Sequence, residues 1–202
     1  MGTWHSLVNE IGLIPALAKV IEANYHDLYK VADEWRDARL AEASSNGFVT
    51  VAFGLRVRTP ILKQTILNTS STPIAAAAES RTTGNALGQS YGLLNNRAGI
   101  EFQERVLKSE YAEQIKPIMQ IHDAMYFLVL NQINVVRWFN DNLPECMAWQ
   151  KLPELEHDTV KLSGGVEIFY PNWNVKTALP NKATNKEIMK ICLDSAKNQT
   201  PS

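Results

Sequence analysis

Apolar residues recur at helical spacing along the first 46 residues of the chain. Intervals of three and four residues are typical of helices that bury one face. Pro15 predicts the first turn of a second helix, and Gly47 predicts a helix end, because glycine tolerates left-handed backbone dihedrals. We therefore expect helices over about residues 6–46, with an apolar face formed by Leu7, Ile11, Ile14, Leu17, Val20, Ile21, Leu28, Val31, Trp35 and Leu40.

The pattern becomes extended after this helical region. Residues 48–53 are mostly β-branched or aromatic, which predicts a strand. Arg56 and Arg58 alternate with Val57, so both guanidinium groups are expected on one side of an extended segment. Residues 68–73 are rich in Asn, Thr, Ser and Pro and predict a loop.

Residues 74–107 predict one long helix. Gly84, Gly88 and Gly92 recur every four residues and leave a bare strip along it. Such a strip admits the close approach of a nucleic acid, and it equally suits the packing of another helix. The strip alone does not decide between these two uses.

A polar ladder follows the same predicted helix. Arg81, Asn85 and Gln89 also recur every four residues and so share one face. These side chains are the ones that hydrogen-bond to base edges, sugars and phosphates. An ordinary solvent-exposed face, which is more often made of Lys and Glu, is the alternative.

The most informative window lies at residues 118–127, where two apolar runs flank His122 and Asp123. This pattern predicts a tight β-hairpin with an acid at its tip. A carboxylate held by two paired strands suits a hard divalent cation such as Mg²⁺. A plain hairpin with a polar turn explains the same window equally well. Further along the chain, we expect a last strand within residues 160–169 and a helix over 186–196.

The composition limits the class of protein but does not indicate a function. The 202 residues are 45% hydrophobic and 20% charged, typical of one globular domain or slightly more. The net charge of −1 combines +4 over residues 47–100 with −3 over 1–46 and −2 over 101–202. A basic middle segment suits a polyanion-binding face, although chance variation also produces it. Cys146 and Cys192 form no metal-binding pattern and fit a reducing compartment.

Several elements in a fixed order resemble a known family. They are Gly-Phe-Val-Thr-x-x-x-Gly-x-Arg at 47–56, Arg-x3-Asn-x3-Gln at 81–89, and Met-Gln-Ile-His-Asp at 119–123. The set is similar to the C-terminal part of family A DNA polymerases, most of all a bacteriophage branch, and the hairpin window resembles that family's motif C. The Gly-Gly…Asn-Trp ending at 164–173 adds to the resemblance, which spans roughly residues 2–176.

The resemblance implies roles for individual residues. Asp123 would ligate two catalytic Mg²⁺ ions in the assembled enzyme, and His122 would touch the primer terminus. Two positions depart from the family pattern: Ala124 replaces the Glu that usually follows His-Asp, and Leu55 replaces the first Arg of a Gly-Arg-Arg. The residues expected to contact template–primer DNA are Arg56, Arg58, Arg81, Asn85 and Gln89.

Two parts of the family's active site have no counterpart in the sequence. These are the strand that carries a second Asp (motif A) and the fingers helix whose Arg, Lys and Tyr bind the incoming dNTP (motif B). We therefore expect a C-terminal half of a polymerase that needs an N-terminal partner chain, in a cytoplasm and without a membrane segment. The chain alone should transfer nucleotides negligibly, because one carboxylate cannot hold two Mg²⁺ ions well.

The fold expected is α+β, an antiparallel palm sheet with the motif C hairpin backed by long helices, plus N-terminal helices from the fingers. The expected parts are the fingers at 1–46, the C-terminal half of the palm at 47–180 and a tail at 181–202. Two other functions stay open. One is a non-catalytic, template–primer-binding remnant of a polymerase, and the other is a plain interaction protein whose hairpin and glycine strip are structural.

Overall fold

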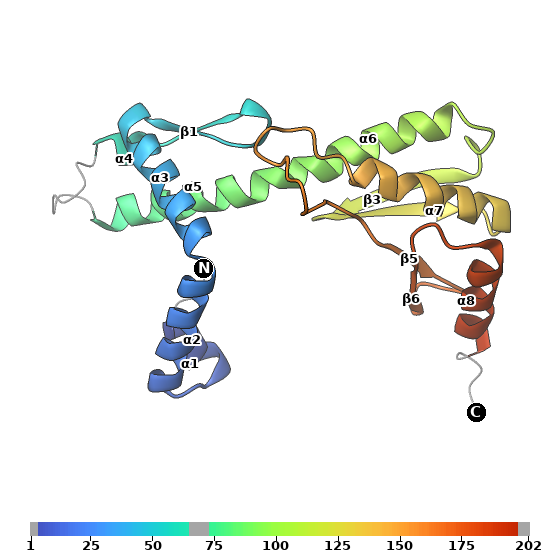
Figure 1. Cartoon of the computed structure of the whole chain (residues 1–202), viewed down its shortest axis with the longest axis horizontal. Coiled ribbons are helices and arrows are strands. Elements are labelled where there is room, and N and C mark those ends of the chain that lie inside the picture. Colours follow the sequence, from blue (N-terminus) through green and yellow to red (C-terminus); the bar gives the residue numbers. More distant parts are fainter. Residues whose placement is uncertain (1–3, 65–72, 198–202) are drawn as a thin grey trace. The chain divides into compact units, whose positions relative to one another are not determined.

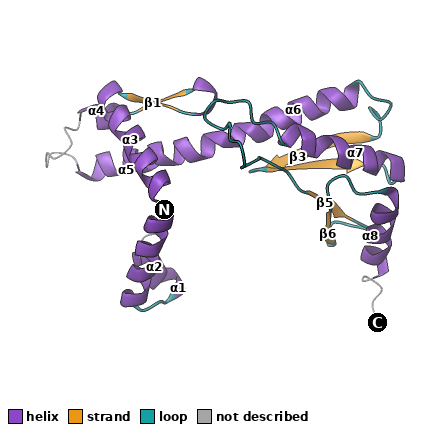
Figure 2. Ribbon diagram, viewed as in Figure 1, coloured by secondary structure: helices purple, strands orange, loops and turns teal. Residues whose placement is uncertain are grey.

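The computed structural model describes residues 4–64 and 73–197. In these ranges the chain combines α-helices with two-stranded antiparallel sheets, so the predicted α+β class is confirmed (Figure 2). The chain forms two compact units, residues 1–90 and 91–202. The predicted part boundaries at residues 46 and 180 fall inside these units and stay predictions.

The first unit begins with three helices, one more than the single predicted break at Pro15 allows, because the chain also turns at Tyr29 (Figure 1). The expected burial of their apolar face is wrong within this chain, since most of its residues, such as Ile14 (66%) and Val31 (79%), are exposed. The break before Pro15 is confirmed, because Pro15 is the first residue of the second helix. Gly47 ends the third helix with a left-handed φ of 78°, and its N–H donates to the carbonyl of Ala43 (2.9 Å). The helices are α1 (Trp4–Ile11), α2 (Pro15–Leu28) and α3 (Lys30–Asn46).

The rest of this unit is a short hairpin and two further helices, packed around a small apolar core. The predicted strand is shorter than expected, because its second half forms the turn η1 that leads into β2. The predicted loop at 68–73 lies almost wholly outside the described residues. The core residues are Ala43, Val49, Leu62 and Leu87. The elements are β1 (Phe48–Thr50), η1 (Ala52–Gly54), β2 (Arg56–Arg58), α4 (Pro60–Gln64) and α5 (Pro73–Gln89).

The prediction of one uninterrupted helix over 74–107 is wrong. A 3₁₀ turn, η2 (Ser90–Gly92), separates α5 from α6 (Leu93–Leu107). Ser90 explains the change, because its hydroxyl donates to the carbonyl of Leu87 (3.1 Å) and accepts the N–H of Ala52 (3.2 Å). A serine that bonds the local backbone, with a glycine two positions later at Gly92, weakens the regular helical ladder.

The second unit has one main core, centred on Phe102. The ring of Phe102 lies edge-on to Phe127 and Phe139, with centroids 5.2 Å away in both cases. Thus α6, the hairpin and α7 share the core, and Val106, Ile115 and other buried residues complete it. The remaining elements are β3 (Ile115–Ile121), β4 (Ala124–Val129), α7 (Ile133–Met147), β5 (Val166–Phe169), β6 (Lys176–Leu179) and α8 (Asn185–Lys197).

The three sheets remain separate within the described part of the chain. β3 pairs only with β4, and β5 pairs only with β6. The hairpin therefore has two open edges among the described residues. The strand predicted within residues 160–169 is confirmed as β5, but it is not the last strand, because β6 follows it. The predicted C-terminal helix is confirmed as α8. Across the described ranges, no helix has the length and apolar character needed to cross a bilayer.

Candidate functional site

The predicted β-hairpin is present, with His122 and Asp123 as its two turn residues. Ile121 pairs with Ala124, which leaves only these two residues between the strands. His122 has a φ of 54°, in the left-handed region that most residues avoid. The strand pairing on both sides fixes the position of the Asp123 backbone. Both turn residues are exposed.

One face of the hairpin is anchored on α6. Met125, Phe127 and Val129 alternate toward the core, as residues two apart on a strand must. The Gln120 amide donates to Asn96 on α6 (2.5 Å). A Cβ on Gly99 would lie 2.8 Å from the Met125 sulfur, so Met125 packs directly against this part of α6. The turn at His122 and Asp123 is therefore held by a hairpin that packs against α6.

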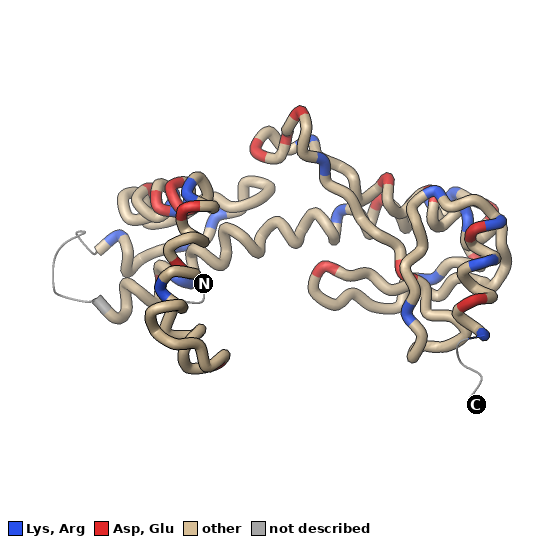
Figure 3. Tube along the Cα trace, turned by 60° about the horizontal axis from the view of Figure 1, so that its bottom comes forward, with Lys and Arg blue, Asp and Glu red and all other residues tan. Residues whose placement is uncertain are grey.

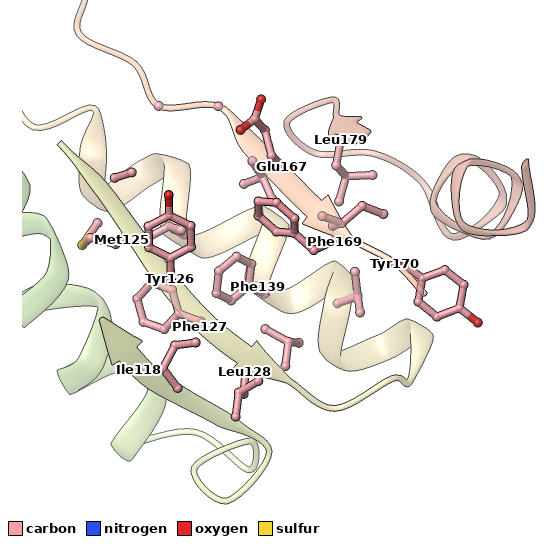
Figure 4. A pocket seen from close by; sticks show the side chains of 18 of the residues that line it. Ile118, Met125, Tyr126, Phe127, Leu128, Phe139, Glu167, Phe169, Tyr170 and Leu179 are labelled. Atoms are coloured by element: carbon pink, nitrogen blue, oxygen red, sulfur yellow. The ribbon is translucent and has the colours of Figure 1, made fainter. Parts of the chain in front are cut away.

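Asp123 is the only carboxylate at the tip of this hairpin. No hydrogen bond or ion pair joins it to any other described residue. It lines a cavity of about 730 Å³ between the hairpin and β5 (Figure 4), and Glu167, the other acid of that cavity, is paired with Lys176 (2.9 Å). A rigidly presented, unpaired carboxylate is the kind of group that a divalent cation needs.

The residues present fit one ligand of a Mg²⁺ site and no more. Within the ranges that the structure describes, no three His, Cys, Asp or Glu side chains gather in a way that could hold a metal ion. Mg²⁺ commonly binds through one or two carboxylates together with substrate phosphates. Asp123 therefore suits a site whose other ligands come from a substrate and another chain.

The strained position of His122 gives a stability prediction. A left-handed φ costs an ordinary residue about 1 kcal/mol relative to glycine. His122→Gly should therefore raise the free energy of unfolding of the second unit by up to about 1 kcal/mol, measured by urea titration. Asp123→Gly is the matched control, because Asp123 has no positive φ, and it should lower stability or leave it unchanged. A loss of stability in His122→Gly would show that the His122 side chain itself holds the turn.

The predicted polar ladder lies on the outer face of α5. Arg81, Asn85 and Gln89 are all exposed, and none of the three bonds to another described residue. Thr83 and Leu87, on the opposite face, are buried. The α5 helix is otherwise nearly free of charge (Figure 3).

The glycine strip lies beside this ladder. At about 100° per residue, Gly84 and Gly88 fall within one quarter-turn of Arg81. A Cβ at either glycine would meet no atom within 4 Å. The packing of a helix of this chain on the strip, which the sequence left open, is therefore not seen among the described residues. The only acid of α5, Glu79, instead accepts the Leu62 N–H (2.5 Å) on the inner side.

Arg56 and Arg58 project from β2 as predicted. Both are exposed, whereas Val57 between them packs against the core of the first unit. The Arg56 guanidinium lies over the Phe48 ring, 4.5 Å from its centroid. Arg56 and Arg58 thus belong with the ladder to the first unit, whereas His122 and Asp123 belong to the second.

An aromatic cluster lies beside the hairpin, and the sequence analysis did not predict it. Tyr126 on β4, Phe169 at the end of β5 and Trp173 in the following turn lie together. Their separation in sequence hides the contact. The Asn-Trp pair that ends the family resemblance is the one signal that pointed to this turn.

No family model matches the chain, and no curated protein matches its sequence.

Proposed function

We propose that this chain is the C-terminal part of a DNA-dependent DNA polymerase of the family A kind, which extends a primer by template-directed nucleotidyl transfer. The observation that carries the proposal is the exposed, unpartnered Asp123 at the tip of an anchored hairpin, directly after a strained His122. Strained residues cluster at functional sites, because surrounding structure must hold them there. The order of sequence elements resembling the family supports the same conclusion.

Asp123 would contribute a negative charge, held in a fixed position, that binds Mg²⁺. Mg²⁺, when bound in the assembled enzyme, supplies activation of the primer 3′ hydroxyl and stabilisation of the leaving pyrophosphate. The chain holds the Asp123 carboxylate in one place relative to α6, so little reorganisation is needed when substrates arrive. His122, as the preceding turn residue, would contact the primer end next to that carboxylate.

The outer face of α5 would hold the template–primer duplex. Arg81, Asn85 and Gln89 offer hydrogen-bond donors and acceptors to sugars and minor-groove base edges. The bare Gly84 and Gly88 positions leave room for a backbone to approach. One positive charge with two amides is a modest electrostatic attraction, so salt dependence should be modest too.

Two features support a requirement for a partner chain. Both outer edges of the β3–β4 hairpin lack a strand among the described residues, and unpaired edges are surfaces on which another strand adds. The N-terminal helices also expose large apolar side chains, with Leu28 75% and Val31 79% exposed. Contiguous exposed apolar surface is typical of protein–protein contact sites. The partner would supply motifs A and B.

A DNA-binding experiment tests the α5 part of the proposal. Arg81→Ala should weaken binding of a primer–template duplex by about 10-fold or more, and Gln89→Ala by about 2- to 10-fold, since charged hydrogen bonds contribute more than neutral ones. Binding would be measured by fluorescence anisotropy in 50 and 200 mM salt. The Arg81 variant should also show a salt slope smaller by about one.

Lys190→Ala is the matched control, because it removes an exposed cation from the middle of α8. That variant should bind the duplex like the wild type. If Arg81→Ala and Gln89→Ala both leave the affinity unchanged, α5 is not the duplex-binding face.

A second function, a template–primer-binding remnant without catalysis, is favoured by one observation. The described residues offer one unpaired carboxylate at the hairpin, and Ala124 stands where a second acid would follow. A remnant would bind primer–template DNA in the same way as the polymerase fragment. Primer extension with a partner chain separates the two.

A further inference from the structure

Three aromatic rings form a fixed group on the second unit. The rings of Phe169 and Trp173 are stacked, with centroids 4.4 Å apart and planes 11° apart. Tyr126 lies 5.3 Å from Trp173 and 6.3 Å from Phe169. The strands β4 and β5 position Tyr126 and Phe169 beside one cavity (Figure 4), so Trp173 rests on rings that are themselves held by strands.

Trp173 is nevertheless 58% exposed. Phe169 covers one face of the indole ring, so the exposed area lies on its remaining surface. Core tryptophans bury most of their area, as Trp138 does by packing against the core around Phe102. An indole that is both ordered and open is a ready surface for a planar ring.

The residues around this ring favour a nucleobase over a phosphate. Asp123 and Glu167 line the same cavity, so without a bound cation their carboxylates disfavour a phosphate there. Lys176 is a cation beside this group: it pairs with Phe169 across the β5–β6 ladder and forms an ion pair with Glu167 (2.9 Å). A nucleotide whose base stacks on Trp173 and whose phosphate faces Lys176 would keep the phosphate away from the two acids and close to a cation.

We infer that Trp173 is a stacking site for an unpaired base of single-stranded nucleic acid, such as the template strand beyond the duplex. This inference rests on the proposed nucleic-acid function. It adds a contact with single-stranded nucleic acid at Trp173, in the turn that follows β5. Base–aromatic stacking tolerates any sequence, because every base has a π-face. The site therefore adds affinity for single strands without base preference.

The test compares two single strands of equal length and charge. A fluorescein-labelled 12-nucleotide thymidine strand and a 12-unit abasic strand carry the same phosphates, but only the first has bases. By anisotropy at 50 mM salt, the wild type should bind the thymidine strand more tightly. Trp173→Ala should lose about 5- to 150-fold in affinity for that strand and should not change its affinity for the abasic strand.

Two further variants make the result specific to the ring. Trp173→Phe keeps a stacking surface and should stay within about 3-fold of the wild type, whereas Trp35→Ala removes an exposed tryptophan of the first unit and should change nothing. The inference is overturned if the wild type binds both strands equally, if it binds neither, or if the Ala and Phe variants of Trp173 behave alike. Duplex binding through Arg81 is measured separately, so the polymerase proposal can survive that failure.

Discussion

Asp123→Asn should lower primer extension by the assembled polymerase by more than about 100-fold, while the affinity for primer–template DNA changes little. The reason is that the Mg²⁺ ions that Asp123 is proposed to ligate would lower the reaction barrier by several kcal/mol, and each 1.4 kcal/mol is a factor of ten in rate. The amide of asparagine keeps the shape of the side chain but removes its charge. Extension would be followed on a labelled primer, and affinity by anisotropy.

The matched control is Asp158→Asn, which neutralises an exposed acid in the segment before β5. It should extend primers like the wild type. Extension retained by Asp123→Asn would mean that the hairpin carboxylate has no role in the chemistry. Parallel loss of extension and of DNA binding would point to damage to the hairpin rather than to the loss of a metal ligand.

The purified 202-residue chain should extend a primer at a negligible rate, and a partner chain should restore the activity. Two Mg²⁺ ions need at least one further carboxylate, and the described residues gather no such set around Asp123. The proposed partner would be a chain with an Asp-bearing strand and a fingers helix carrying Arg, Lys and Tyr. The reading frame that precedes this one is the first place to seek it.

The comparison uses equal amounts of the chain, the partner and their mixture, with Mg²⁺ and all four dNTPs. The mixture should extend the primer, and each chain alone should not. Robust extension by the 202-residue chain alone would overturn the divided-polymerase proposal. Duplex binding without extension in the mixture would favour the non-catalytic remnant.

Local sequence signals predicted most of the elements. The helices before Gly47, the two-residue turn at His122 and Asp123, and the outward ladder at Arg81 follow from spacing and turn chemistry, which act over a few residues. The structure therefore agrees with these predictions.

Contacts between distant residues could not be read from the sequence. Ser90 interrupts the long helix partly through a bond to Ala52, which is 38 positions away. The contacts of the Tyr126 ring with Trp173 and Phe169 join segments more than 40 residues apart. Periodicity reports which face of an element is apolar, and it does not report which partner covers that face.

The most direct test of the central proposal asks what the primer end touches. A primer ending in 4-thiothymidine, annealed to its template, is bound to the chain with Mg²⁺ and irradiated, and the cross-linked peptide is identified by mass spectrometry. The polymerase proposal predicts a cross-link within residues 115–129, which include His122 and Asp123. Cross-links that fall only elsewhere on the chain, from a duplex that binds, would contradict it.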